Sequence, residues 1–539
     1  MGMKVLFVYP NLFGMNMLPP AIGILNSVLL EQGHTTALFD TTNYGQWHHL
    51  DVVSDRLKED RLNARPTDDS RLQASLKIDS PGPDFVEMVR SFQPDLMAFS
   101  VTEDMYPNAL ELLRYLPPGS RPPTVMGGVF PTFAPRLALE KASALVDFVI
   151  TGEGETALAT FCESLEKGRD LHKVPGIAFF EPDGSFFKNP LPGLVNPDHV
   201  PLPNYDLFDE SRFYRPMQGE LRRMFPVETI RGCPYTCAYC NSPSQNAIYA
   251  ESKITFLRKT STEVIYDQIR HLVDRYHPDS LYFWADTFLA QSENEFDAFC
   301  DMYSEFKLPF WIQTRPETVT KRKFERLKEV GLLRVSFGVE HGNANFREKV
   351  LMRRVENDLV VENLNLLSDL GIPFSVNNIV GFPHETRELA FDTIELNRQI
   401  RSDGINAYSF TPFHGTPLRT VAELAGFVRP GEITRSIMKP TMLRMPHWPK
   451  QSIEGFRRCF VLYVKLPKDR WHEVEQAEML TPAGDQIWDE LREEVLQNYM
   501  PWGDRAEEED AGRIELESDD FAVNDAIDSS LLNSIQARD

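Results

Sequence analysis

Two series of short apolar segments that alternate with amphipathic segments constrain the fold of this chain more than any other feature. Apolar runs bounded by turn residues are typical of buried strands, and strands that alternate with helices indicate a parallel sheet covered on both faces. The first series therefore predicts a doubly wound α/β domain over residues 1–165. Its predicted strands are 4–10, 36–40, 96–101, 124–127 and 146–150, and its predicted helices are 21–32, 85–92 and 108–116.

The second series extends over residues 216–430. Its six βα repeats are too few to close the eight-stranded barrel that such repeats commonly form, so we predict an open, partial (β/α)6 barrel. The predicted strands are 227–230, 280–284, 310–313, 333–337, 373–379 and 407–410, and the predicted helices are 262–276, 293–306, 321–330, 358–370 and 385–398.

The remaining segments are predicted from their turn residues and charges. Residues 166–215 are expected to hold a hairpin around the turn Pro182-Asp183-Gly184 and then a proline-rich connector. Residues 431–503 are expected to form a small, mostly helical region. Residues 504–539 are acidic and poor in apolar side chains, a composition that predicts disorder.

The overall charge bears on the possible partners. The chain has 79 acidic and 56 basic residues, a formal net charge of -23. This balance argues against a nucleic-acid partner, because phosphate contacts need clustered lysine and arginine. No apolar run approaches the about 20 residues that cross a bilayer, and the first residues lack the pattern of a signal peptide. We therefore expect no transmembrane segment and a cytoplasmic location.

Three of the six cysteines, Cys233, Cys237 and Cys240, lie close together directly after a predicted strand. Structural zinc usually takes four protein ligands, and no second cysteine or histidine pair of suitable spacing follows. A catalytic zinc with three thiolates, or three merely buried cysteines, are the weaker alternatives. Three thiolates suit a [4Fe–4S] cluster that leaves one iron open for a cofactor or substrate. We predict that these cysteines ligate such a cluster.

The spacing of these cysteines, with aromatic Tyr239 before the last, resembles the CxxxCxΦC loop of the radical S-adenosylmethionine (SAM) enzymes. The resemblance implies that SAM binds the open iron and is cleaved to a 5′-deoxyadenosyl radical, chemistry that belongs to the cofactors. The implied SAM contacts are Asp286 with its amino group, Arg315 with its carboxylate or a ribose oxygen, Glu340 with its ribose, and Gly381 with its adenine. An ion pair between Asp286 and Arg315 within the barrel is the alternative.

A doubly wound domain ahead of such a barrel resembles the cobalamin-binding class of the same superfamily, whose best-known branch is similar to the anaerobic magnesium-protoporphyrin cyclase. The resemblance spans residues 3–425 and implies cobalamin at the carboxyl ends of the strands, where such sheets bind ligands. The implied contacts are Ser100, Thr102, Gly127, Gly128, Gly152 and Glu153. No Asp-x-His-x-x-Gly motif is present, so cobalt would lack the histidine ligand of that motif. The alternative is a sheet that kept its fold and lost its ligand.

These features predict an enzyme that methylates a poorly activated carbon of a small molecule, lipid or tetrapyrrole, by hydrogen abstraction and methyl transfer from methylcobalamin. The main alternative is cobalamin-dependent oxidation, cyclisation or rearrangement without methyl transfer. A methylthiotransferase fits less well, because its relatives carry further N-terminal cysteines and residues 1–161 contain none. A non-catalytic electron carrier or sensor fits least, since such proteins give every iron a thiolate. The expected partners are the substrate and an electron donor such as flavodoxin or ferredoxin.

Overall fold

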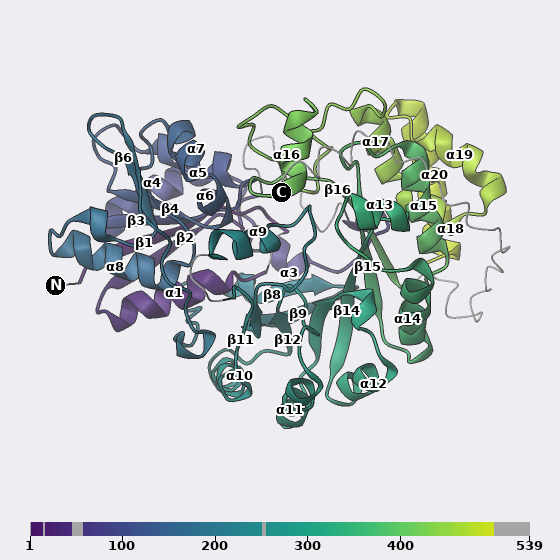
Figure 1. The fold of residues 1–539 in the computed structure, drawn as a ribbon, viewed down its shortest axis with the longest axis horizontal. Coiled ribbons are helices and arrows are strands. Elements are labelled where there is room, and N and C mark those ends of the chain that lie inside the picture. The colour runs from purple at the N-terminus through teal and green to yellow at the C-terminus, as the bar shows by residue number, and fades with distance from the viewer. Residues whose placement is uncertain (1, 15–16, 46–57, 251–254, 501–539) are drawn as a thin grey trace.

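The computed structural model describes residues 2–14, 17–45, 58–250 and 255–500, and Figure 1 shows their arrangement. The acidic tail predicted over 504–539 lies outside these residues. Two seven-stranded sheets dominate the described part of the chain, the first in its N-terminal part and the second in its middle part.

The first sheet confirms the predicted doubly wound fold. Its strand order is β2-β1-β3-β4-β5-β6-β7, in which the first five strands are parallel and β6 and β7 add antiparallel. The strands are β1 (Lys4–Tyr9), β2 (Thr35–Asp40), β3 (Leu96–Ser100), β4 (Thr124–Gly127), β5 (Phe148–Ile150), β6 (Ile177–Phe180) and β7 (Phe186–Lys188). The helices are α1 (Pro20–Glu31), α3 (Ser70–Gln73), α4 (Pro81–Phe92), α5 (Tyr106–Tyr115), α6 (Val129–Phe133), α7 (Pro135–Ala142) and α8 (Gly154–Glu166).

The predicted hairpin forms, but it extends the first sheet. Strand β6 pairs with β5, through Val149 opposite Ala178, and the turn of the hairpin places β7 at the sheet edge. The pairing explains why Ala178 of this hairpin is buried.

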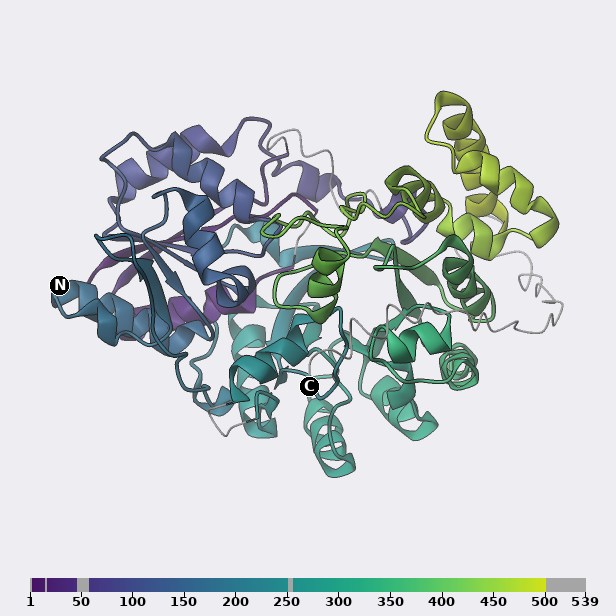
Figure 2. The same ribbon diagram turned by 45° about the horizontal axis from the view of Figure 1, so that its top comes forward.

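The second sheet curls into the predicted partial barrel, which Figures 1 and 2 show beside the first sheet. Its order is β16-β15-β14-β13-β12-β9-β8, with β8 antiparallel to β9 and the other pairs parallel. The strands are β8 (Tyr214–Met217), β9 (Glu220–Glu228), β12 (Ser280–Trp284), β13 (Phe310–Thr314), β14 (Leu332–Glu340), β15 (Phe374–Val380) and β16 (Gly404–Ser409). A separate two-stranded ladder joins β10 (Ile230–Arg231) to β11 (Arg258–Lys259).

The first barrel strand begins earlier than predicted. We expected it at 227–230, whereas β9 starts at Glu220 and ends at Glu228. Its first four residues are charged or partly exposed and pair with β8, so they carry no apolar signal. The predicted end of the strand was also wrong, because Ile230 belongs to the separate ladder with β11.

The barrel helices are α9 (Asn241–Ile248), α10 (Thr262–Tyr276), α11 (Glu293–Tyr303), α12 (Lys321–Glu329), α13 (Ala344–Lys349), α14 (Asn357–Asp369), α15 (Arg387–Arg398) and α16 (Pro417–Leu424). Helices α10 to α15 cover the outer face of the barrel, whereas α9 and α16 lie beside the cysteine loop (Figure 1). A C-terminal group of helices, which Figure 2 shows at one end of the molecule, packs against α15 and β16. The C-terminal helices are α17 (Lys450–Arg458), α18 (Phe460–Lys465), α19 (Trp471–Ala477) and α20 (Pro482–Asn498). None of the described helices is long and apolar enough to cross a membrane.

One apolar core continues from the first sheet into the barrel. Tyr205, from the connector, packs against Phe225 of β9 with ring centroids 5.8 Å apart. Its ring also lies against α1, where a Cβ at Gly23 would come within 2.6 Å of it. Because interiors are close-packed and resist deformation, this shared core holds the two sheets at a fixed orientation.

Candidate functional site

The cysteine loop lies between β10 and α9, at the carboxyl end of the first barrel strand. Gly232 opens it with a φ of +88°, a conformation that glycine adopts without strain. Backbone hydrogen bonds hold the loop on two sides: Ala238 donates to the Leu351 carbonyl at 3.0 Å, and Leu418 donates to the Ala238 carbonyl at 3.0 Å. The loop is therefore fixed in place by distant parts of the barrel.

The three cysteine sulfurs lie in a partly buried, hydrogen-bonded setting. Arg315 Nη1 donates to Cys237 Sγ at 3.3 Å, and Cys233 Sγ lies 3.6 Å from Thr287 Oγ1. Burial raises the pKa of the Cys233 thiol, and it raises the pKa of the Cys240 thiol to about 12. Thiols of this kind deprotonate readily only when a metal or another cation compensates the charge.

The three thiolates need not share one metal ion to serve as ligands of a cluster. Among the described residues, no group of three or more His, Cys, Asp or Glu side chains could hold one metal ion. A [4Fe–4S] cluster uses a different iron for each thiolate, so the sulfurs need not converge on one point.

Asp286 and Arg315, which could have paired with each other, have separate partners. Asp286 follows β12 and accepts a hydrogen bond from Ser242 Oγ at 2.7 Å. Arg315 follows β13, bonds Glu317 Oε1 at 2.5 Å, and lies with its guanidinium 3.6 Å from the Tyr235 ring centroid. Burial raises the pKa of Asp286, although the Ser242 hydrogen bond opposes the shift. A cationic group next to this carboxylate would restore its charge.

Glu340 and Tyr239 lie together with a buried arginine that the sequence did not single out. Arg353 Nη1 lies 3.3 Å from both Glu340 Oε1 and the Tyr239 hydroxyl. Glu340 follows a bulge in β14 and has a φ of +73°. Such strain in a non-glycine residue is characteristic of functional positions. Burial raises the pKa of Glu340, even though Arg353 opposes the shift.

Gly381 begins a tight loop after β15. Its φ is +86°, and its backbone N–H donates to the buried Glu385 carboxylate at 2.6 Å. The N–H of Phe382 donates to the same oxygen at 2.8 Å. The two N–H groups are therefore used within the loop.

A cavity of about 380 Å³ lies between the first sheet and the barrel. The carboxyl ends of strands from both sheets border it. The predicted residues that line it are Ser100, Gly127, Gly128, Gly152, Glu153 and Asp286. Trp284, which is 37% exposed, borders it from the barrel side.

Thr102, which was also expected to contact cobalamin, is not among the residues that line this cavity. Its side chain is exposed, and its hydroxyl donates to Asp104 Oδ1 at 2.5 Å in the turn after β3. The chain leaves the sheet edge one residue earlier than we predicted, since β3 ends at Ser100.

Two glycines bring backbone to the cavity wall. Gly128 has a φ of +118°, and a Cβ there would lie 2.2 Å from the Val101 carbonyl oxygen. At Gly127 a Cβ would meet only the Ile150 carbonyl oxygen, at 3.9 Å. The space beside Gly127 therefore lets a large ligand approach the backbone closely, as a corrin ring requires, whereas Gly128 is required by its own backbone conformation.

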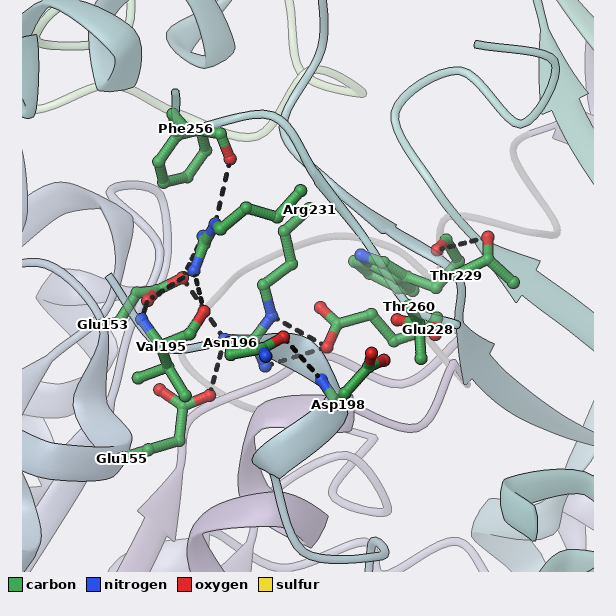
Figure 3. Close-up of polar contacts among 12 residues, drawn as sticks. Glu153, Glu155, Val195, Asn196, Asp198, Glu228, Thr229, Arg231, Phe256 and Thr260 are labelled. Atoms are coloured by element: carbon green, nitrogen blue, oxygen red, sulfur yellow. Dashed lines mark hydrogen bonds and ion pairs between the residues drawn. The ribbon is translucent and has the colours of Figure 1, made fainter. Parts of the chain in front are cut away.

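Arg231 and Glu153 join the two sides of the cavity through a charged network (Figure 3). Arg231, two residues before Cys233, pairs with Glu155 at 2.7 Å and with Glu228 at 2.8 Å. Glu153 pairs with both Arg231 and Arg258. Burial opposes the charge on Glu153, but the two arginines outweigh it and hold its pKa below the usual range.

No pattern in the sequence marks Arg231, Glu155, Glu228 and Arg258 as parts of one network. Glu153 was expected to contact cobalamin, whereas its carboxylate also accepts the Val195 N–H at 2.8 Å and is occupied by arginines. Arg231 had one usable signal, its place immediately before the cysteine loop. Arg258 had no such signal, because it lies 105 positions from its partner Glu153 and a pair so far apart leaves no local pattern in the sequence.

Comparison with known proteins supports both halves of the structure. The sequence matches the Radical SAM superfamily over residues 227–396 and the B12 binding domain over residues 67–161. The cysteine loop lies in the first of these segments, and much of the cavity wall of the first sheet lies in the second.

Two relatives and one solved structure extend the comparison. An uncharacterised methyltransferase of Pyrococcus horikoshii is 23% identical over 75% of this chain and 86% of its own length. The anaerobic magnesium-protoporphyrin IX monomethyl ester cyclase of Rubrivivax gelatinosus is 24% identical over 85% of this chain and 78% of its own. The radical SAM methyltransferase TsrM of Kitasatospora setae, solved with cobalamin and a [4Fe–4S] cluster, has a TM-score of 0.59 at 15% identity, covering 92% of this chain and 100% of its own. The likeness to TsrM concerns the fold alone.

Proposed function

We propose that this chain, which combines a B12-binding domain with a radical SAM domain and so belongs to the cobalamin-binding radical SAM enzymes, methylates a poorly activated carbon of its substrate. The observation that carries the proposal is the single cavity bordered by the carboxyl ends of both sheets. A radical formed beside the cysteine loop and a methyl group carried by the first domain would then act in one space. When bound, the cluster and SAM supply the radical, and cobalamin supplies the methyl group.

The chain's own residues hold and shield these groups. We assign Cys233, Cys237 and Cys240 to the cluster. The Arg315 guanidinium, which donates to Cys237 Sγ at 3.3 Å, offsets the negative charge of a bound thiolate. The surrounding barrel would shield the radical from bulk solvent and from oxygen, which traps carbon radicals.

The SAM contacts follow from the side chains around the loop. Asp286 accepts a hydrogen bond from Ser242 and borders the cavity, so its carboxylate is available to an ammonium group. Glu340 is oriented by Arg353 and can accept hydrogen bonds from ribose hydroxyls. Tyr239 supports this carboxylate. Gly381, whose positive φ turns the chain after β15, is assigned to the backbone beside the adenine.

Cobalamin is assigned to the cavity wall formed by Ser100, Gly127, Gly128 and Gly152. None of the residues that line the cavity is a histidine, so the lining provides no imidazole for cobalt. Glu153 is assigned a different role from the one first expected. It positions Arg231, and thereby the start of the cysteine loop, against the first domain.

A second candidate follows from the similarity to the cyclase, which is as extensive as the similarity to the methyltransferase. In that case the radical would lead to oxidation or cyclisation without methyl transfer. Both candidates need the same cofactors, and their products differ in mass.

Methyl-deuterated SAM separates the two candidates. The reconstituted protein is incubated with a reductant, the labelled SAM and a small-molecule extract of its native cells, and products are analysed by mass spectrometry. We expect a product that carries the deuterated methyl group, together with S-adenosylhomocysteine and 5′-deoxyadenosine. 5′-Deoxyadenosine with an unlabelled, oxidised or cyclised product would support the second candidate and contradict the first.

A further inference from the structure

Two arginines and one glutamate meet where a segment of the N-terminal part of the chain touches helix α17. Arg61 Nη2 donates to Glu454 Oε1 at 2.6 Å. Arg457 donates to the same Oε1 at 3.0 Å and to Oε2 at 2.8 Å. One carboxylate therefore serves two guanidinium groups, and both of its oxygens are occupied.

The donors left over on the two arginines are buried. Among the residues that the structure describes, Nη1 of Arg61 and Nη1 of Arg457 have no hydrogen-bond partner, and both atoms are buried. Arg457 as a whole is 2% exposed. Buried polar groups are nearly always hydrogen-bonded, because an unpaired donor away from water is costly.

The charges in this cluster do not balance either. Within the described part of the chain, Glu454 is the carboxylate whose charge stabilises Arg457, and the guanidinium of Arg61 repels that of Arg457. Burial and this repulsion lower the pKa of Arg457 to about 10, although Glu454 opposes the shift. A buried excess of positive charge of this kind calls for an anion.

The cluster is held in place from both sides. In its hydrogen-bonding orientation the Asn63 amide donates to the Ile405 carbonyl of β16 at 3.0 Å and to the Arg61 carbonyl at 3.1 Å. On the other side, Arg457 Nη2 donates to the Met438 carbonyl at 3.0 Å. The two arginines are thus preorganised, so that little ordering remains to be done when a ligand binds.

Helix α17 places this cluster near the reaction side of the barrel. Ile453 lies four residues before Arg457, on the same face of the helix. A Cβ at Gly381 would lie 3.2 Å from Ile453 Cγ2. The cluster therefore lies about one helical turn from the loop that follows β15.

We propose that Arg61 and Arg457 form a binding site for one oxyanion, a carboxylate or phosphate group, which receives hydrogen bonds from their two free Nη1 atoms. Two guanidinium groups that each keep one free N–H suit a group with at least two oxygens. If the proposed function holds, on which this step rests, the oxyanion belongs to the substrate. The substrate class is then an anionic molecule, whose charged end is held here while its reacting carbon lies at the cavity.

Calorimetric titration of the reconstituted holoenzyme with sodium phosphate and with sodium acetate, at constant chloride, tests the site directly. The informative variant is Arg61→Gln, because Arg457 still satisfies Glu454 and no buried carboxylate is left alone. We expect the wild type to bind at least one of the two anions. Arg61→Gln should bind that anion at least about tenfold more weakly, because the variant loses one charge-assisted hydrogen bond to it. Without anion, the variant should be as heat-stable as the wild type or more so, because the excess charge is gone.

Arg65→Gln is the matched control. It removes the same charge from an exposed position of the same segment and leaves Glu454 untouched. Anion binding equal in the wild type and Arg61→Gln would place the anion elsewhere and overturn the proposal. No binding of phosphate or acetate to the wild type would also overturn it, and would mean that water fills the space. These titrations measure anion binding without methyl transfer, so their result does not depend on whether the proposed function is correct.

The link to the substrate has its own readout. For the labelled product, Arg61→Gln should raise KM while kcat stays near the wild-type value, since a remote anchoring contact contributes equally to ground and transition states. An unchanged KM, with the titration positive, would keep the anion site and contradict its assignment to the substrate.

Discussion

The two sides of the cofactor region differ in the chemical character of the groups that form them. On the barrel side, the cysteine loop is surrounded by charged and hydrogen-bonding side chains, among them Arg315 at Cys237 and Arg231 just before the loop. On the side of the first sheet, most of the cavity wall is backbone and apolar side chains, with Gly127 and Gly128 among the lining residues and Glu153 and Glu155 as its charged groups. A cluster with thiolate ligands needs compensating charge, whereas a large ring needs shape and a close approach of backbone.

The largest effects should come from the cysteine loop. Each of Cys233→Ala, Cys237→Ala and Cys240→Ala should abolish iron–sulfur absorbance and 5′-deoxyadenosine formation, because each removes one of three ligands. Cys300→Ala is the control, since Cys300 is buried in the core and its thiol packs as a small apolar group. Loss of the cluster in Cys300→Ala would contradict the assignment of three ligands.

Replacement of Arg231 should have the next largest effect. Arg231→Met leaves Glu153, Glu155 and Glu228 without this cation, and a broken buried pair costs about 3–5 kcal/mol of unfolding free energy. Chemical denaturation measures the difference. A loss below about 1 kcal/mol, the value of an exposed pair, would show that the network contributes little to joining the two domains.

The loss of unfolding free energy in Arg231→Met should depend on pH. The arginines hold the pKa of Glu153 below its usual value of 4.5, so their stabilisation is complete above that pH and is lost as the pH falls through the lower folded-state pKa. The two proteins should therefore differ most at neutral pH and converge in acid. A pH-independent difference would assign the effect to packing.

Alanine replacements of the two cavity-wall glycines distinguish an effect on backbone conformation from an effect on ligand binding. Gly128→Ala forces a Cβ against the Val101 carbonyl at positive φ and should lower stability by about 1–3 kcal/mol. Gly127→Ala has room for its methyl group, so it should leave stability unchanged and weaken cobalamin binding, measured by absorbance titration. Equal cobalamin affinity in Gly127→Ala and wild type would show that the ligand does not reach this wall.

The smallest effect is expected at the protein surface. Arg275 pairs with Asp206, and both side chains are about half exposed. Arg275→Gln should therefore change the unfolding free energy by at most about 1 kcal/mol. This variant has the same charge change as a replacement of Arg231 and calibrates the larger effect.

Strands with uninterrupted apolar residues could be predicted from the sequence almost to the residue, as at Ser280–Trp284, because burial on both faces leaves a continuous signal. The start of β9 could not, since its first residues are polar and pair only with β8. The position of Cys233, Cys237 and Cys240 in a loop was likewise readable from their spacing and the preceding strand.

The partners of the site residues were harder to predict. Glu153 and Arg258 lie 105 positions apart, and Arg353 approaches Tyr239 from 114 positions away. Such pairs depend on how the two sheets pack and on side-chain directions, for which a single sequence carries no periodic signal. Thr102 illustrates the same limit at short range, because one residue decides whether a side chain lies at the sheet edge or in the following turn.

The absorption and electron paramagnetic resonance spectra of the purified protein after loading with cobalamin test most directly whether the first sheet and the barrel enclose this cofactor. Because none of the lining residues is a histidine, we predict stable binding with a base-off spectrum, no nitrogen ligand to cobalt, and no change in any single His→Ala variant. Cobalamin that is lost on gel filtration, or a spectrum with a coordinated histidine, would contradict the assignment.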